Sequence, residues 1–454
     1  MTTLASLARD LKAGAATSRR LVEECLARIA EPNGEGPRTF LKVHAESARA
    51  AADYYDRLRA QGVTLSPWTG IPISVKDLFD VAGDVTTAGS KALRGEAPAS
   101  ADCAAVARLR AAGFIPIGRT NMTEFAYSGL GVNPHYGTPL NPFERHRARA
   151  PGGSSSGAAV SITEGMSYGA LATDTGGSCR IPAAFCGTVG FKPTAWRVPV
   201  SGVFPLSQTL DSVGHLAASV ACCATLDAVL ANEPTAALEP IEPRARRFAV
   251  PTRYALEALD PHVARSFEHA IRELGTAGAE IEEIPLAELD ELPGLNRKGG
   301  FSGAEAYAAH RERIDSQGAS YDPRVLVRIL RGREQSAAEY LDLIRARADL
   351  QRRIDRPLAQ FEAVLLPTTP IIAPLLEELE TDEAYMRINQ MALRNTAVAN
   401  FLDRCAISIP CQVPGTAPVG LMLMGPHGAD RRLLGLAAAV EALVSPTPGS
   451  RELV

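Results

Sequence analysis

Short apolar runs alternate with helical patterns along most of this sequence, and the alternation limits the chain to a few architectures. The clearest apolar runs are Ile71–Val75, Phe114–Gly118, Tyr168–Ala172 and Phe248–Val250. Helical patterns lie between them, for example Ala101–Ala112 and Ser156–Glu164. Strands that are apolar throughout must be covered on both faces. The pattern therefore predicts an α/β fold with a large, mixed but mostly parallel twisted sheet and helices on both faces.

The domain organisation is predicted to be a single unit, residues 1–454, because the sequence has no internal repeat and no long Pro/Gly/Ser-rich linker. We expect four successive segments within this unit. They are a helical N-terminal segment (1–65), a central core (66–229), a variable helical segment that shapes a cleft (230–360) and a C-terminal return to the sheet (361–454).

Composition and charge exclude several classes of function. The 454 residues carry 47 basic and 51 acidic side chains, a net charge of −4, which offers no basic surface for nucleic acid or an anionic membrane. The most apolar long stretch, Leu216–Leu230, is interrupted by Asp227 and predicts a buried helix rather than a membrane span. The eight cysteines form no Cys-x-x-Cys pair, which predicts buried free thiols in a reducing compartment. We therefore expect a soluble, cytoplasmic protein.

Two glycine–serine segments carry the chemical signal. The first, residues 151–157, reads Pro-Gly-Gly-Ser-Ser-Ser-Gly and precedes a helical run; the second, residues 174–182, reads Asp-Thr-Gly-Gly-Ser-Cys-Arg-Ile-Pro and follows a strand-like run. A glycine turn between a strand and a helix lets several backbone N–H groups converge on one point. Such a point binds an anion or the oxyanion that develops when a carbonyl is attacked.

A serine nucleophile needs a base, and no histidine of the sequence has a convincing catalytic setting. Lys76 is the alternative, because it directly follows the apolar run Ile71–Val75. A lysine at the carboxyl end of a buried strand points into the crevice where α/β proteins bind ligands, and burial there favours the neutral amine. The local pattern also fits an ordinary lysine at a strand end that pairs with Asp77.

The combination of these segments resembles the amidase signature family of serine hydrolases. The signature itself corresponds to residues 152–193. Further similarity covers most of the chain outside 230–360, in particular Gly70–Asp77, Asn121–Phe125, Leu206–Gly214, Leu366–Thr368 and Pro418–Leu421. The resemblance implies the amidase signature fold and hydrolysis of the carbon–nitrogen bond of a linear amide through a Ser-cisSer-Lys triad.

Each matching residue takes its role from that resemblance. Ser178 corresponds to the nucleophile that forms an acyl-enzyme. Ser154 corresponds to the bridging serine, which directly follows a cis peptide bond, and Lys76 corresponds to the base. The oxyanion hole corresponds to the backbone amides of Thr175, Gly176, Gly177 and Ser178, and the supporting polar residues to Ser155, Asp174 and Arg180.

Substrate contacts are expected from the segment between Lys76 and Ser154 and from the surroundings of the nucleophile. The candidates are Ala126, Tyr127, Gly129, Ile181 and Gln208. The resemblance implies a small-molecule amide or carbamate as substrate, with aryl amides and ureas in the same class and esterase activity as a side reaction. It implies no metal, no cofactor, no nucleic acid and no membrane, and a monomer or homodimer.

Two positions depart from the family pattern. Ser156 stands where many members have glycine, a change that a helix start tolerates. Asp403 and Arg404 stand where a glycine is common, which affects the pocket wall or the packing there but not the triad.

Three other functions compete with this assignment. An α/β-hydrolase with Ser155 in a Gly-x-Ser-x-Gly elbow is disfavoured, because the preceding Glu144–Ala150 is charged rather than an apolar strand. A nucleotide-binding module is disfavoured because neither glycine turn has a phosphate-binding pattern. The glutaminase-type subunit of a tRNA-dependent amidotransferase stays open as the alternative, since some members of the family have that role.

Overall fold

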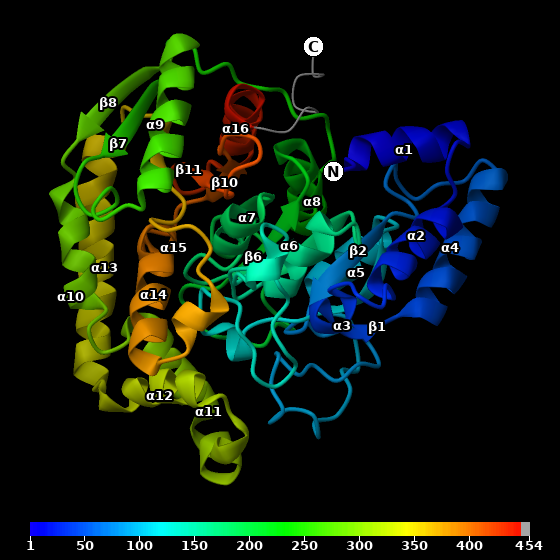
Figure 1. Ribbon diagram of the computed structural model, residues 1–454, viewed down its shortest axis with the longest axis horizontal. Coiled ribbons are helices and arrows are strands. Elements are labelled where there is room, and N and C mark those ends of the chain that lie inside the picture. Colours follow the sequence, from blue (N-terminus) through cyan, green and yellow to red (C-terminus); the bar gives the residue numbers. More distant parts are fainter. Residues whose placement is uncertain (446–454) are drawn as a thin grey trace.

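One eleven-stranded sheet runs through the protein (Figure 1), whose computed structural model describes residues 1–445. The strand order is β1-β3-β2-β4-β6-β5-β10-β11-β9-β7-β8. The strands are β1 (Phe40–Val43), β2 (Pro72–Lys76), β3 (Ile115–Thr120), β4 (Gly169–Asp174), β5 (Val189–Lys192), β6 (Ser212–Ala217), β7 (Arg247–Pro251), β8 (Glu280–Ile284), β9 (Ala363–Pro367), β10 (Ala406–Pro410) and β11 (Gly420–Met424).

The sheet is mixed as predicted, but the expectation that it is mostly parallel is wrong. Strands β2, β3 and β4 are parallel to one another, as are β7, β8 and β9. The remaining neighbours, including β4–β6, β6–β5, β5–β10, β10–β11 and β11–β9, are antiparallel. An apolar run indicates that a strand is buried on both faces, and it carries no information about strand direction.

Helices connect the strands and cover both faces of the sheet. They are α1 (Leu4–Ala13), α2 (Ser18–Ile29), α3 (Gly36–Thr39), α4 (Ala45–Ala60), α5 (Ala104–Ala111), α6 (Ser156–Thr163), α7 (Arg180–Cys186), α8 (Val220–Ala231), α9 (Pro261–Thr276), α10 (Leu292–Leu295), α11 (Gly300–Gln317), α12 (Pro323–Arg331), α13 (Ala337–Leu358), α14 (Asp382–Arg394), α15 (Thr396–Phe401) and α16 (Asp430–Val444). In the described part of the chain, six short 3₁₀ turns complete them: Glu124–Ala126, Arg145–Arg147, Ala287–Glu291, Gly318–Ser320, Gly332–Glu334 and Leu376–Leu379.

The alternation of side chains along each strand explains the two helical layers. In β4, Ala170 and Ala172 pack with α6 and α7, whereas Leu171 belongs to the core cluster that contains α8 and α16. In β11, Leu421 and Leu423 belong to that same cluster, and the methionines that alternate with them pack with α13 and α15. The apolar runs are therefore continuous because both faces of each central strand are buried.

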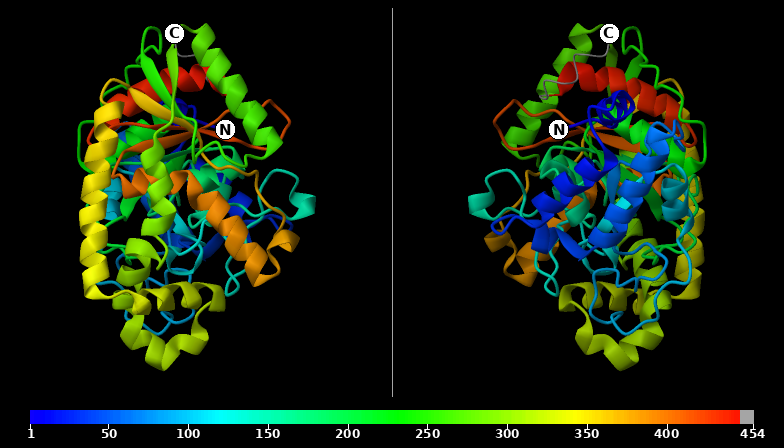
Figure 2. Two further views of the ribbon diagram at one scale, coloured as in Figure 1. Left: turned by 90° about the vertical axis from the view of Figure 1, so that its left-hand side faces the viewer. Right: turned by 90° about the vertical axis from the view of Figure 1, so that its right-hand side faces the viewer.

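Helix α16 lies at one end of the molecule, and α11 with α12 lies at the opposite end (Figures 1 and 2). The 230–360 segment supplies α11, α12 and α13, as its charged, helical pattern predicted. It also supplies β7 and β8, so it extends the sheet as well as flanking it. The predicted helix over Leu216–Leu230 begins later, at Val220, because the residues before it complete β6.

Within residues 1–445, no helix combines the length and the apolar character that a bilayer crossing needs. All eight cysteines are free and buried, as the sequence predicted.

Candidate active site

Lys76 is the last residue of β2, and its side chain is completely buried. Its Nζ donates hydrogen bonds to Ser154 Oγ at 2.8 Å and to Thr173 Oγ1 at 2.9 Å. The neighbouring Asp77 instead accepts from Arg119 Nε at 2.7 Å. The ordinary pairing of Lys76 with Asp77, which the local pattern allowed, is thus absent from the structure.

Burial also sets the protonation of Lys76. Among residues 1–445, no carboxylate lies within ion-pair distance of its ammonium group, and burial lowers the pKa of Lys76 to about 8. The more distant acidic groups Asp174 and Asp211 counteract this effect only in part. A considerable share of this amine is therefore neutral near pH 8, as a base requires.

Ser154 is presented to Lys76 by the first glycine segment. The peptide bond between Gly153 and Ser154 is cis, as the resemblance implied. A Cβ on Gly153 would lie 2.4 Å from the backbone nitrogen of Gly131, so no larger residue fits there. Glycine at this position lets the chain approach its neighbour closely enough to aim Ser154 Oγ at the amine.

Ser178 lies in the turn between β4 and α7 and lines a cavity. The two glycine–serine segments are in contact, since the N–H of Ser155 donates to the carbonyl of Ser178 at 3.3 Å. Within the described chain, no hydrogen bond joins Ser154 Oγ to Ser178 Oγ. The structure thus brings Lys76 and Ser154 into direct contact and places Ser178 beside them.

The expected oxyanion amides divide into two groups. The N–H of Gly177 donates to Asp174 Oδ1 at 2.8 Å and is engaged, contrary to the expectation of four free donors. The N–H groups of Thr175, Gly176 and Ser178 donate to no other group among residues 1–445. Gly177 has φ +135° and a Cβ there would lie 2.2 Å from Thr396 Oγ1, so this position requires glycine.

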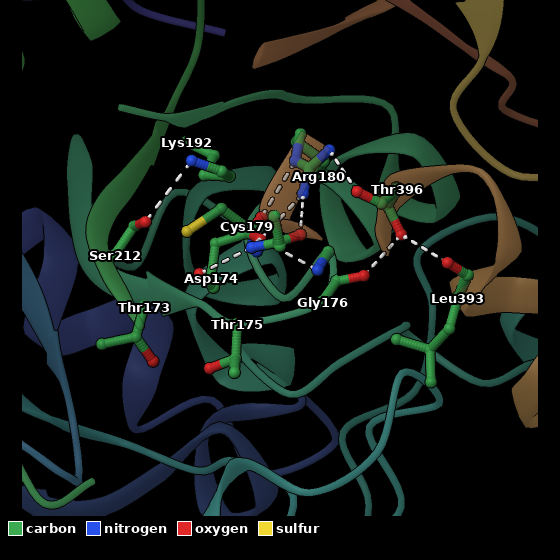
Figure 3. A network of polar contacts seen from close by, with 12 residues as sticks. Thr173, Asp174, Thr175, Gly176, Cys179, Arg180, Lys192, Ser212, Leu393 and Thr396 are labelled. Atoms are coloured by element: carbon green, nitrogen blue, oxygen red, sulfur yellow. Dashed lines mark hydrogen bonds and ion pairs between the residues drawn. The ribbon is translucent and has the colours of Figure 1, made fainter. Parts of the chain in front are cut away.

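Asp174 and Arg180 brace this turn (Figure 3). Their side chains are completely buried and form an ion pair of 2.8 Å. Burial alone would raise the pKa of Asp174, but Arg180 outweighs it and the pKa is lowered to about 2. Asp174 Oδ2 also accepts from the N–H of Cys179 at 3.0 Å. The expected supporting role of this pair therefore has a geometric basis.

The brace continues into the C-terminal segment, which sequence reasoning missed. Arg180 donates to Asn400 Oδ1 at 2.7 Å and to the carbonyl of Thr396 at 2.9 Å. Asn400 Nδ2 in turn donates to Asp174 Oδ1 at 2.9 Å. The nearby Asp403, which replaces a common glycine, has φ +51°, a conformation that Asp adopts more readily than most residues.

Two further contacts were not predicted from the sequence. Ser155 Oγ donates to the carbonyl of Thr173 at 3.3 Å, so Thr173 is bonded to both Lys76 and the expected supporting serine. Asp211 accepts from Thr175 Oγ1 at 2.5 Å, and burial raises the pKa of Asp211 to about 6. Thr173 directly precedes the second glycine segment, and only that position could have indicated it.

A cavity of about 280 Å³ opens beside Ser178. The core and the C-terminal segment line it with Ala126, Tyr127, Ser128, Thr175, Gly176, Ser178, Leu206, Leu210, Met386, Asn389, Gln390, Leu393, Ala397, Asn400 and Phe401. The 230–360 segment lines it with Tyr254, Leu292, Asn296, Gly299, Ser302, Arg328 and Arg331. No cluster of metal-binding side chains occurs within residues 1–445.

The five expected substrate contacts fall into three classes. Ala126 and Tyr127 line the cavity. Gly129 and Ile181 lie behind its wall, where a Cβ on Gly129 would meet Ile181 Cδ1 at 3.0 Å. Gln208 is exposed and does not line this cavity, so its contact with substrate stays a prediction. Its neighbours Ser207 and Thr209 bond to Glu305 at 2.5 and 3.0 Å, and this fixes the turn with Gln208 toward solvent.

Comparisons with known proteins agree with this site. The Amidase family model matches residues 20–434. The "2-amino-5-chloromuconic acid deaminase" of Comamonas testosteroni is 38% identical over 97% of this chain and 96% of its own length. A glutamyl-tRNA(Gln) amidotransferase subunit of Roseiflexus sp. (strain RS-1) is 33% identical over 97% of this chain and 96% of that protein.

A solved structure described as "Crystal structure of amidase" superposes with a TM-score of 0.88 at 31% identity, and covers 98% of this chain and 100% of that one. The sequence match, the shared fold and the buried lysine–serine contact all lead to the same assignment. This chain belongs to the Amidase family of enzymes, which hydrolyse the carbon–nitrogen bonds of amides.

Proposed function

We propose that this enzyme hydrolyses a small-molecule amide through an acyl-enzyme on Ser178, with Ser154 and Lys76 as the proton relay. The observation that carries the proposal is the 2.8 Å contact between Lys76 Nζ and Ser154 Oγ in a fully buried site. A lysine whose pKa lies near 8 accepts a proton at neutral to alkaline pH, whereas a solvated lysine does not.

The relay first carries a proton from Ser178 through Ser154 to Lys76, and later returns a proton through Ser154 to the leaving nitrogen. Neutral Lys76 takes the proton of Ser154, Ser154 takes that of Ser178, and Ser178 Oγ attacks the carbonyl carbon. Because the hydrogen bond between the two serines is not formed in the structure, the proposal requires Ser178 Oγ to close on Ser154 when substrate binds. Catalytic hydrogen bonds that are loose without substrate commonly tighten in this way.

The tetrahedral oxyanion accepts hydrogen bonds from the amides of Thr175, Gly176 and Ser178, each of which stabilises the transition state by about 3 kcal/mol. Gly177 positions these donors through its bond to Asp174 and is not itself a free donor. When the intermediate collapses, the carbon–nitrogen bond breaks and the leaving nitrogen takes the proton from Ser154. Water then attacks the ester of Ser178, again losing its proton to the relay.

The test combines a rate with a direct view of the intermediate. Hydrolysis is measured by release of ammonia or amine from an anilide, a primary amide, a urea and a carbamate, and by release of the alcohol from an ester. An amino-substituted unsaturated diacid is included because of the deaminase relative. Ser178→Ala should abolish turnover and the acyl adduct seen by intact-protein mass spectrometry. Ser156→Ala is the matched control and should retain activity, because its hydroxyl makes only one long hydrogen bond, of 3.4 Å. Wild-type rates in Ser178→Ala would refute the proposal.

The alternative is the glutaminase-type subunit of a tRNA-dependent amidotransferase. The deaminase relative, whose name denotes no larger assembly, is 38% identical and favours the first function over the amidotransferase subunits, which are 32–33% identical. Purified chain that hydrolyses simple amides without a partner would support the amidase. Glutamine-specific activity that requires a partner would support the amidotransferase role.

The proposal also covers the cellular compartment and the oligomeric state of the enzyme. Eight buried free thiols support a reducing, cytoplasmic compartment, because such thiols persist there without pairing. We propose a monomer or homodimer that acts on a free small molecule and binds no nucleic acid.

A further inference from the structure

Asn389 lies on α14 in the wall of the cavity that also contains Ser178, and only 4% of the residue is exposed. Its side-chain oxygen, Oδ1, accepts two hydrogen bonds of 2.8 Å, one from the N–H of Gly129 and one from Ser128 Oγ. Its side-chain nitrogen, Nδ2, has no partner among residues 1–445. A buried amide nitrogen without a partner is unfavourable, because it has lost its hydrogen bonds to water.

The orientation of this amide group is fixed by its neighbours. A backbone N–H can only donate, so the atom that faces Gly129 must be the oxygen of Asn389. Ser128 Oγ already accepts from Tyr385 Oη at 2.8 Å and from the N–H of Leu130 at 3.3 Å. The hydrogen of the Ser128 hydroxyl therefore goes to Asn389 Oδ1. A flipped amide group would lose both bonds, so Nδ2 is held on the opposite side from Gly129.

The other asparagines of the cavity wall use their amide nitrogens within the protein. Asn296 Nδ2 donates to the carbonyl of Leu292 at 3.0 Å. Asn400 Nδ2 donates to the carbonyl of Asp174 at 3.0 Å and to its Oδ1 at 2.9 Å. Among the described asparagines that line the cavity, only Asn389 therefore has an amide nitrogen that is available to a ligand.

Asn389 is also close to the reacting groups. The carbonyl of Gly129 accepts from the N–H of Gly153, the first residue of the cis peptide bond, at 2.8 Å. Leu393, one turn later on α14, lies beside the expected oxyanion turn, because a Cβ on Gly176 would be 3.3 Å from Leu393 Cδ2. Four residues of an α-helix rise about 6 Å, so a short acyl chain can extend from the oxyanion turn to Asn389.

We infer that Asn389 Nδ2 donates a hydrogen bond to an uncharged carbonyl oxygen on the acyl chain of the substrate. The substrate is then a short amide with a second carbonyl group, separated by one to three carbon atoms from the amide carbon that Ser178 attacks. This inference rests on the proposed function of Ser178. An uncharged amide nitrogen supplies a hydrogen bond but no counter-charge, which suits a neutral acceptor. Asn389 thereby determines specificity, because a chain without the acceptor leaves Nδ2 unbonded.

The test compares ketone-containing amides with analogues of the same shape that lack the acceptor. Acetoacetamide, levulinamide and the next longer homologue are each paired with the compound in which a methylene group replaces the ketone oxygen. Ammonia release is followed at pH 9, where Lys76 is largely neutral. For the best spacer, kcat/KM of the wild type should be about tenfold higher for the ketone than for its methylene analogue.

Two variants of Asn389 remove the donor. Asn389→Asp keeps the oxygen that Gly129 and Ser128 bind and replaces only the nitrogen by a second oxygen. At pH 9 this carboxylate is charged and repels the ketone oxygen, so kcat/KM should fall about 100-fold for the ketone and less than threefold for the analogue. Asn389→Ala introduces no charge and should abolish the preference for the ketone, which covers the case in which Asn389→Asp does not fold.

Asn296→Asp is the matched control. It makes the same substitution in the same cavity wall, at an amide nitrogen that is already bonded to Leu292. It should leave the ratio of kcat/KM between ketone and analogue unchanged.

A binding measurement separates this inference from the proposed function. Calorimetry with the Ser178→Ala protein should show that the ketone binds about tenfold more tightly than its analogue, and Asn389→Asp in the same background should abolish the difference. If the wild type hydrolyses neither compound but this difference in binding persists, the proposed function fails and the carbonyl site at Asn389 stands. Equal kcat/KM for both members of every pair, an equal loss on both in Asn389→Asp, or the same loss of preference in Asn296→Asp would each overturn the inference.

Discussion

The activity of this enzyme should fall steeply with acid, because only neutral Lys76 can accept a proton. Burial lowers the pKa of Lys76 to about 8. A base with that pKa is about 90% neutral at pH 9, about 10% at pH 7 and about 1% at pH 6. Since the charged form is inactive, kcat/KM should be about 90-fold lower at pH 6 than at pH 9, with the acid limb centred near pH 8.

The assay is kcat/KM for an amide that does not itself titrate between pH 6 and 10, at constant ionic strength, with circular dichroism at each pH to show that the protein is folded. Asp211 needs a control, because its pKa is raised to about 6 and it bonds to Thr175 in the same turn. Asp211→Asn removes that titration and should leave the limb near pH 8.

Three results would refute the reasoning on Lys76. A flat profile between pH 6 and 9 in folded enzyme would exclude lysine as the base. A limb near pH 6 that disappears in Asp211→Asn would assign the titration to the aspartate. A limb that rises to about pH 10.5, the ordinary value for lysine, would mean that burial does not perturb the amine.

Two further variants test the surroundings of the relay. Thr173→Val removes one of the two acceptors of the Lys76 ammonium group, so the charged form is destabilised and the acid limb of the pH profile should move to lower pH; an upward shift would contradict this. Asp174→Asn leaves Arg180 as a buried unpaired charge and should lower the free energy of unfolding by about 3–5 kcal/mol in urea titrations, whereas a loss below 1 kcal/mol would show that the pair does not brace the turn.

The strands with apolar runs could be predicted from the sequence, but whether neighbouring strands are parallel or antiparallel could not. Strand β7 spans Arg247–Pro251 and contains the apolar run Phe248–Val250 that indicated it, and β2 ends one residue later than its run, at Lys76 itself. Strand β8 has the sequence Glu-Ile-Glu-Glu-Ile and lies at the edge of the sheet, where none of its residues is fully buried, so no apolar run marks it. Direction depends on pairings between distant segments, which local patterns do not record.

Some residues of the candidate site could likewise be expected from the sequence, and others could not. The contact between Lys76 and Ser154 was expected only from the resemblance of their segments to the amidase signature family, because the local pattern of Lys76 also fitted an ordinary lysine at a strand end. Asn400 and Arg328 occupy segments without a motif, and only the tertiary fold brings them to the turn and the cavity. Gln208 lies outside the cavity lining, and the turn that carries it is held by Glu305, a residue far along the chain that bonds to Ser207 and Thr209.

The brace between Asp174, Arg180 and Asn400 has a consequence for biosynthesis. A ribosome makes the first two residues long before it makes the third, and the buried ion pair receives its remaining partner only when helix α15 docks. Until then the nascent polypeptide contains both glycine–serine segments, but the turn that would receive an oxyanion lacks the hydrogen bonds of Asn400. The complete set of contacts around this turn therefore depends on a residue that lies more than two hundred positions after it in the sequence.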